Sequence, residues 1–162
     1  MSKVIVFPGQ GSQFVGMGEG LFDKYSELTD KANALLPYNL AELCLDDPKR
    51  VLNATEYTQP ALYSVCVMEY LNWRENADEH VSYFAWHSLG EYAALYAAGV
   101  IDFETGLQMV IKRGALMANA PKGAMAAVLN LEQQRVQELL AHSNFQNIDV
   151  ANINSLMQTV VS

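Results

Sequence analysis

The chain has 162 residues, of which 51% are hydrophobic and 17% are charged, as in a soluble globular protein of about one domain. Its formal net charge of −8 argues against a partner nucleic acid, because phosphates require a basic surface. No stretch approaches the roughly 18 consecutive apolar residues of a membrane span, and the apolar run at 4–7 is too short for a signal peptide. We therefore expect a cytoplasmic protein that binds neither membrane nor nucleic acid.

The first part of the sequence alternates short strands with helices. Residues 3–7 and 81–86 are apolar runs rich in β-branched or aromatic residues, and each predicts a buried strand. Thr58 and Pro60 resemble an N-cap region and a first-turn proline. Apolar residues at helical spacing predict further helices, and the predicted helices cover about 17–36, 58–71, 89–98 and, after a cap at Asp102, 103–111. The alternation predicts an α/β core that reaches to about residue 122.

After residue 122 the pattern changes. The expected order is strand, helix, strand, strand, at about 125–129, 130–141, 149–154 and 158–162. Asn130 with Gln133 resembles a capping box at the start of the helix. This order predicts the start of a smaller α+β subdomain over 123–162. The last strand carries no turn signal, so we expect the subdomain to be truncated.

The two cysteines, Cys44 and Cys66, indicate neither a disulfide framework nor a metal site. They show no CxxC spacing and have no His or Cys partners at metal-ligand intervals. Cys66 lies within an apolar helical pattern, which favours a small buried hydrophobic residue, with a reactive thiol as the lesser alternative. We predict no metal site in this sequence.

The stretch Trp86-His87-Ser88-Leu89-Gly90-Glu91 follows a predicted strand and precedes a predicted helix. In that context a G-x-S-x-G pattern forms a nucleophile elbow, a sharp turn that exposes the serine oxygen at a helix N-terminus. Gly90 is present, but Trp86 replaces the first glycine. The pattern by itself therefore leaves two interpretations open for Ser88, a nucleophile or an ordinary serine at a helix start.

A glycine-rich loop at 8–13 follows the first predicted strand. Gly11 and Gly16 have the spacing of a phosphate-binding loop, but Met17 and Gly18 replace the required Lys and Ser/Thr. A dinucleotide-binding fingerprint fails because Phe14 stands in place of its third glycine. The remaining use of such a loop is to bring backbone N–H groups close to a reacting oxygen.

Together these segments resemble the malonyl-CoA:acyl carrier protein transacylase family, in particular the free-standing acyltransferases that serve polyketide synthases without an acyltransferase domain of their own. Six stretches match in family order across essentially the whole chain, at 6–13, 58–62, 87–92, 112–117, 123–128 and 151–154. The resemblance implies an α/β hydrolase-like core with a short parallel sheet and flanking helices at 1–122. It also implies an incomplete ferredoxin-like α+β subdomain at 123–162.

The resemblance also implies the reaction and its residues. Ser88 would take a malonyl group from malonyl-CoA as an ester and pass it to an acyl carrier protein. The backbone N–H of Leu89 and the loop residue Gln10 would form the oxyanion hole. Arg113 would bind the malonyl carboxylate, although its helix pattern alone also fits a solvated surface charge. Gln59 has a weaker claim to substrate binding, and malonyl-CoA is a substrate, so no cofactor is implied.

Two departures from the family affect these expectations. None of His80, His87 and His142 matches the catalytic histidine of the family, which belongs to a segment beyond residue 162; we interpret His80 and His142 as surface residues. Trp86 is expected to crowd the elbow or fill the acyl pocket. Two alternatives therefore stay open: a proofreading acyl hydrolase of the same family, and a catalytically incomplete half-domain that binds a carrier protein or a complementary C-terminal chain.

Overall fold

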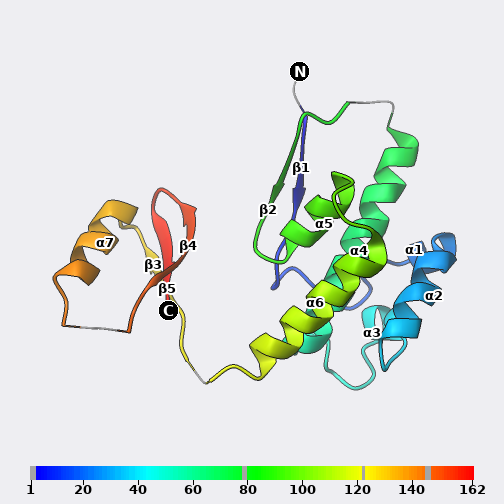
Figure 1. Cartoon of the computed structure of the whole chain (residues 1–162), viewed down its shortest axis with the longest axis horizontal. Coiled ribbons are helices and arrows are strands. Elements are labelled where there is room, and N and C mark those ends of the chain that lie inside the picture. The colour runs from blue at the N-terminus through cyan, green and yellow to red at the C-terminus, as the bar shows by residue number, and fades with distance from the viewer. Residues whose placement is uncertain (1–2, 78–79, 122, 145–146) are drawn as a thin grey trace. The chain divides into compact units, whose positions relative to one another are not determined.

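The structure is a computed structural model that describes residues 3–77, 80–121, 123–144 and 147–162. The chain divides into two compact units, Met1–Ala120 and Pro121–Ser162. The elements of the first unit, in chain order (Figure 1), are β1 (Val4–Phe7), α1 (Leu21–Lys24), α2 (Ser26–Leu35), α3 (Leu40–Leu45), α4 (Thr55–Asn76), β2 (Tyr83–Trp86), α5 (Gly90–Ala97) and α6 (Phe103–Ala118). Those of the second unit are β3 (Ala126–Leu129), α7 (Gln133–Ala141), β4 (Val150–Ser155) and β5 (Gln158–Val161).

The first unit is built around α4. Residues 58–68 of this helix are buried on every side, as expected for a helix enclosed by other elements rather than lying on a surface. Helices α1, α3, α5 and α6 all pack against it. Because these helices all pack against α4, the position of α4 determines how they lie relative to one another.

Strands β1 and β2 form a two-stranded parallel sheet, and Phe7 pairs with Trp86 at its carboxyl end. The side chains of Phe7 and Phe84 point to one face and pack against Tyr70 of α4. On the other face Val4 and Val6 are more than half exposed. The carboxyl ends of both strands therefore lie side by side, which brings together the loops that follow them.

Several helix boundaries differ from the sequence predictions. The helix expected at 17–36 is two helices, α1 and α2, and begins only at Leu21, because Gly18 and Gly20 adopt positive φ angles in the preceding turns. Helix α4 begins at Thr55, so the interpretation of Thr58 as an N-cap was wrong; its hydroxyl instead donates to the carbonyl oxygens of Leu52 and Ala54.

The predicted caps of two other helices have opposite outcomes. Asp102 caps α6 as predicted, since its carboxylate accepts a 2.7 Å hydrogen bond from the Thr105 amide. The capping box of Asn130 and Gln133 was wrong: the N-cap of α7 is Glu132, without a side-chain cap, and Asn130 adopts a φ of 60° in the turn before it.

The second unit is an antiparallel sheet in the order β3-β5-β4, with α7 connecting β3 to β4. Val136 of α7 is buried, and Thr159 of the central strand is fully enclosed. The predicted strand-helix-strand-strand order is confirmed, while its ferredoxin-like character stays a prediction. Over the described ranges, we find no helix long and apolar enough to cross a membrane.

Candidate active site

Ser88 lies at a sharp corner between β2 and α5. Its φ angle is 48°, in the left-handed region that non-glycine residues rarely adopt. The corner is closed by hydrogen bonds from the Gly90 amide to the His87 carbonyl, 3.0 Å, and from the Glu91 amide to the Ser88 carbonyl, 3.1 Å. An ordinary N-cap serine has an extended backbone, whereas here Leu89 is the N-cap. The backbone at Ser88 is therefore that of a nucleophile elbow.

Two glycines allow the end of β1 to press against this corner. A Cβ atom on Gly90 would lie 2.8 Å from the Pro8 carbonyl oxygen, and still nearer to that of Phe7. A Cβ atom on Gly9 would lie 2.6 Å from the His87 carbonyl oxygen. A side chain in either place would force the backbone segments apart, so the close approach seen here requires glycine at both positions. The glycine-rich loop is thereby brought to the backbone immediately before Ser88.

Arg113 reaches Ser88 from α6, 25 residues later in the sequence. Its Nη2 atom donates a 2.8 Å hydrogen bond to Ser88 Oγ. The adjacent Gly114 packs on the start of α4, where a Cβ atom would lie 3.1 Å from the Thr55 carbonyl oxygen. A solvated surface charge would not contact the serine in this way. The guanidinium is instead placed where it can bind an anionic group of an acyl substrate.

Of the two residues predicted to form the oxyanion hole, Leu89 directly follows Ser88, and Gln10 lies in the loop packed against His87. Leu89 is 1% exposed, and no hydrogen bond joins its backbone amide to another residue in the described part of the chain. Gln10 follows Gly9 in the loop packed against His87. Its Nε2 atom donates to Thr55 Oγ1 at 3.0 Å. An N–H at a helix start can stabilise negative charge on a substrate oxygen.

The side chain of Gln59, in α4, contacts the side chain of Gln10. It is fully buried, and its Nε2 atom donates to Gln10 Oε1 at 3.4 Å and to Met117 Sδ at 3.1 Å. Its own Oε1 atom has no hydrogen-bond partner within the described ranges. The structure thus places Gln59 behind Gln10 rather than on an open surface. Sequence reasoning misses Thr55 altogether, because no local pattern reveals a contact with a residue 45 positions away.

Trp86 is the last residue of β2, two residues before Ser88. Its side chain is 51% exposed, and it lines neither the groove beside Arg113 nor the cavity along β1. The expectation that this indole crowds the elbow or fills an acyl pocket stays a prediction. His80 and His142 are exposed, as predicted for surface residues.

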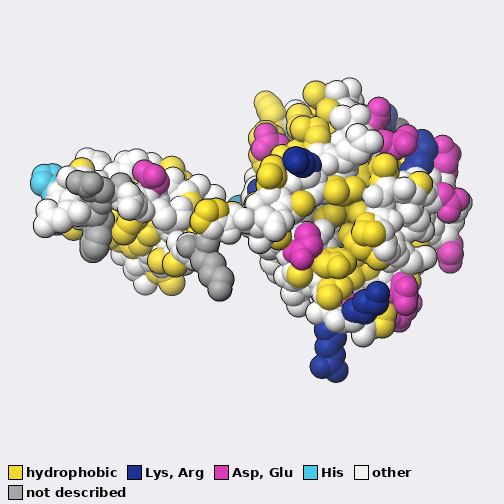
Figure 2. All heavy atoms as spheres, turned by 60° about the horizontal axis from the view of Figure 1, so that its bottom comes forward, with side chains coloured by type: hydrophobic (Ala, Val, Ile, Leu, Met, Phe, Trp, Pro, Cys, Tyr) yellow, Lys and Arg dark blue, Asp and Glu magenta, His cyan; other side chains and the backbone are white. Residues whose placement is uncertain are grey.

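An open groove of about 620 Å³ runs beside Arg113 between α5 and α6. Tyr92, Met109 and Leu116 give it apolar walls, and Gln108 and Lys112 give it polar ones. Figure 2 shows hydrophobic side chains gathered on one face of the first unit, with charged side chains around them. Much of the apolar surface that the described residues of this unit form is therefore exposed to solvent.

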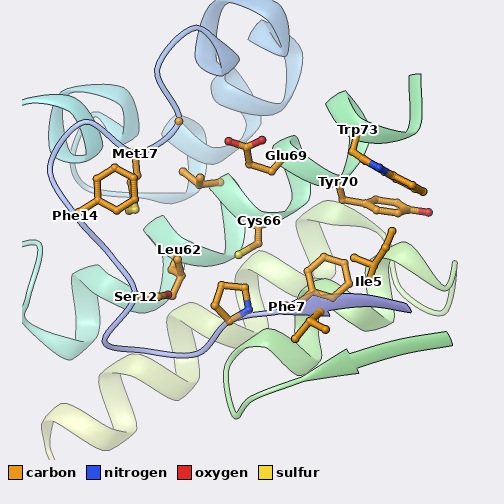
Figure 3. Close-up of a pocket in the computed structure, with 14 residues that line it drawn as sticks. Ile5, Phe7, Ser12, Phe14, Met17, Leu62, Cys66, Glu69, Tyr70 and Trp73 are labelled. Carbon is orange, nitrogen blue, oxygen red and sulfur yellow. The ribbon is translucent and has the colours of Figure 1, made fainter. Parts of the chain in front are cut away.

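A separate cavity of about 410 Å³ lies between β1, the glycine-rich loop and α4 (Figure 3). Its walls are mainly apolar, with Phe7, Phe14 and Tyr70 around it, and Glu69 supplies a carboxylate. Cys66 lines it from α4, and burial raises the pKa of this thiol to about 12. The cavity contains neither Ser88 nor Arg113. The preference for a buried Cys66 is confirmed.

The relatives of this chain form a consistent set. A malonyl CoA-acyl carrier protein transacylase of polyketide biosynthesis, PksC of Bacillus subtilis, is 49% identical over 157 residues, which are 97% of this chain and 54% of the relative. The malonyl CoA-acyl carrier protein transacylase of Synechocystis is 42% identical and is matched over 100% of this chain and 55% of its own length.

Solved structures agree. The malonyl CoA-acyl carrier protein transacylase of Burkholderia pseudomallei superposes with a TM-score of 0.92 at 44% identity, over 99% of this chain and 56% of that one. A malonyl-transacylase in complex with a type II polyketide synthase acyl carrier protein gives a TM-score of 0.86 at 36% identity, over 99% and 54%. The predicted α/β class with a short parallel sheet and flanking helices is confirmed.

The chain spans about half the length of these relatives. A family model described as "Acyl transferase domain" matches residues 4–162. Since that match includes the strained serine, the loop beside it and the arginine that contacts it, the resemblance found in the sequence is confirmed: the chain belongs to the acyl transferase domain family.

Proposed function

We propose that the protein moves a malonyl group from malonyl-CoA to an acyl carrier protein through an ester on Ser88. The observation that carries the proposal is the 2.8 Å contact between Arg113 Nη2 and Ser88 Oγ at the elbow. A malonyl thioester has a carboxylate two bonds from its reacting carbonyl, so one guanidinium beside the nucleophile can hold the carboxylate while the carbonyl meets Ser88. Acetyl groups offer Arg113 no such partner.

In the proposed first step, Ser88 Oγ attacks the thioester carbonyl and its proton passes to a general base. We propose that this base is a histidine outside residues 1–162, as the resemblance to the family implies. The backbone amides of Leu89 and Gln10 stabilise the developing oxyanion, and each such donor contributes about 3 kcal/mol to the transition state. The C–S bond then breaks, and coenzyme A leaves as the thiol. In the second step, the thiol of the carrier protein's phosphopantetheine attacks the ester and restores Ser88.

Intact-protein mass spectrometry of the whole protein after mixing with malonyl-CoA tests this proposal. We expect a mass increase of one malonyl group, absent from Ser88→Ala, that disappears when holo-acyl carrier protein is added and reappears on the carrier. An ester that is released as free malonate without the carrier would favour the hydrolase alternative. No ester under any condition would refute acyl chemistry and leave the binding half-domain.

A second proposal concerns a complementary polypeptide, whether in the same chain or separate. Parallel sheets are normally covered on both faces, yet Val4, Val6 and Tyr83 on the β1–β2 sheet are 52%, 67% and 66% exposed. We propose that further polypeptide covers this face. Supplying the C-terminal half of a relative should raise the yield of the Ser88 ester; no effect on the ester or on the thermal unfolding temperature would contradict the idea.

The cellular location is also a proposal. Cys44 and Cys66 are both free and buried, which suits a reducing compartment, and the proposed substrate and carrier protein require no membrane. We therefore propose that the protein acts in the cytoplasm. Fractionation of the cells that make it would test this, and recovery in the membrane or extracellular fraction would overturn it.

A further inference from the structure

We propose that Thr55, the first residue of α4, is a positioning residue for acyl transfer. In this view its hydroxyl holds the side chain of Gln10, so that the Gln10 backbone amide faces the oxyanion that forms beside Ser88. The inference rests on the proposed function, because that function gives the Gln10 amide its task. Thr55 itself touches neither the nucleophile nor the acyl group in this scheme.

The loop that carries Gln10 needs such an anchor. Gln10 lies between Gly9 and Gly11, and Gly11 adopts a φ of 107° with nothing within 4 Å of the place a Cβ atom would take. Glycines on both sides leave a residue with much backbone freedom. An amide stabilises an oxyanion effectively only when its direction is set before the reaction. Contact of Gly9 with His87 fixes one end of the segment, and Ser12 closes the turn because its amide and hydroxyl donate to the Gly9 carbonyl oxygen at 3.3 and 2.8 Å. Hydrogen bonds to the Gln10 side chain add a further constraint on the orientation of Gln10.

The side chain of Gln10 supplies that constraint, because both ends of its carboxamide are held. Its Nε2 atom donates to Thr55 Oγ1 at 3.0 Å, and its Oε1 atom accepts from Gln59 Nε2 at 3.4 Å. The contact with Thr55 is the shorter of the two. A threonine hydroxyl both donates and accepts, so it can hold either end of an amide. Thr55 is therefore the stronger of the two side-chain anchors on Gln10.

Thr55 also contacts the helix that carries Arg113. A Cβ atom on Gly114 would lie 3.1 Å from the Thr55 carbonyl oxygen and 3.2 Å from Glu56 Cα. Helix α6 thus packs directly on the peptide group of Thr55, one residue after Arg113. A single residue at the start of α4 therefore fixes both the loop with the oxyanion donor and the helix with the carboxylate-binding group. The separation of these two groups is what a malonyl thioester must match.

Three variants of the whole protein test the inference: Thr55→Val, which keeps the side-chain shape but removes the hydroxyl; Thr55→Ser, which keeps the hydroxyl; and Ser64→Ala. The last is the matched control, because Ser64 is buried on the same helix and its hydroxyl donates to the Pro60 carbonyl oxygen of that helix at 2.8 Å rather than to Gln10. We expect Thr55→Val to lower the maximal rate of Ser88 acylation about tenfold, with KM for malonyl-CoA nearly unchanged. Thr55→Ser and Ser64→Ala should acylate at close to the wild-type rate.

A second measurement reads the loop without requiring activity. Hydrogen exchange of the peptide covering residues 8–13 should accelerate in Thr55→Val but not in Thr55→Ser or Ser64→Ala. Wild-type rates of both acylation and exchange in Thr55→Val would overturn the inference while leaving the proposed function intact. A wild-type protein that forms no ester would instead refute the proposed function, and with it the catalytic role of Thr55.

Discussion

Replacing Gly90 with alanine tests whether close packing of two backbone segments shapes the elbow. The added Cβ atom would lie 2.8 Å from the Pro8 carbonyl oxygen and nearer still to that of Phe7, whereas ordinary van der Waals contact begins at 3.4 Å. Both neighbours are backbone atoms at the end of β1, so no side chain can rotate away. The Phe7 carbonyl oxygen is the nearer of the two and sets the separation: the corner and the strand end must move apart by roughly 1 Å, given the dense packing of protein interiors.

Two opposing effects set the expected size of the change. Alanine is favoured over glycine inside a helix by about 1 kcal/mol, and Gly90 is the first residue of α5 with no positive φ to strain an alanine. The steric conflict costs about 1–3 kcal/mol, so the net loss of stability is modest. Activity is more sensitive, because a displacement approaching 1 Å costs about 100-fold in rate. We expect Gly90→Ala to fold, with Ser88 acylation lowered by about one to two orders of magnitude.

The assay is the rate of ester formation with malonyl-CoA, followed by intact-protein mass spectrometry, alongside the thermal unfolding temperature. Gly123→Ala is the matched control, since nothing lies within 4 Å of the added Cβ and its φ is ordinary. The control should leave both quantities unchanged. If Gly90→Ala also acylates at the wild-type rate, the backbone contact does not position Ser88 and the reasoning is refuted.

Three further predictions concern the surroundings of the site. Arg113→Lys keeps the charge but loses the planar fork, so acylation by malonyl-CoA should fall at least about tenfold while acylation by acetyl-CoA changes little; an equal fall with both donors would contradict a carboxylate-binding role. Trp86→Gly should acylate no faster than wild type, because the indole is half exposed and lines neither cavity described above, and a clear acceleration would show that it does obstruct the site. Burial raises the pKa values of Cys44 and Cys66 to about 12. Both thiols should therefore resist alkylation at pH 8 in the native protein and become reactive only as the pH approaches that value. Rapid labelling of either cysteine, mapped by mass spectrometry, would disprove their burial.

Local sequence patterns predicted the elements where one local interaction decides the conformation. Asp102 caps α6 because its carboxylate needs only an amide three residues away. Thr58 resembled a cap by composition, but its hydroxyl bonds to carbonyl oxygens of the preceding turn, and α4 begins earlier. The failure at Asn130 is of the same kind, since the turn before α7 gives that residue a positive φ. At both positions more than one local conformation is possible. Tertiary packing decides which one forms, and a local sequence pattern carries no information about that packing.

For the candidate site, the serine, the glycine after it and the strand-to-helix context were visible in the sequence, and the family match assigned Arg113. The requirement for glycine at position 9 was not, because it arises from contact with His87, 78 residues later. Thr55 was invisible for the same reason. Contacts between residues far apart in sequence depend on how α4, α5 and α6 pack, and no local pattern encodes that geometry.

The amino-acid sequence alone therefore determined the class of this protein, because strand and helix periodicity and motif order are local properties of the chain. Only the tertiary structure decided that Ser88 has a strained backbone, that Arg113 contacts its hydroxyl and that Gln10 is held between Thr55 and Gln59. The contacts of Arg113 and of Gln10 join residues that are 25 to 49 positions apart in the sequence. The physical reason is that the type of side chain determines which hydrogen bonds a residue can form, whereas tertiary packing determines which partner lies within reach.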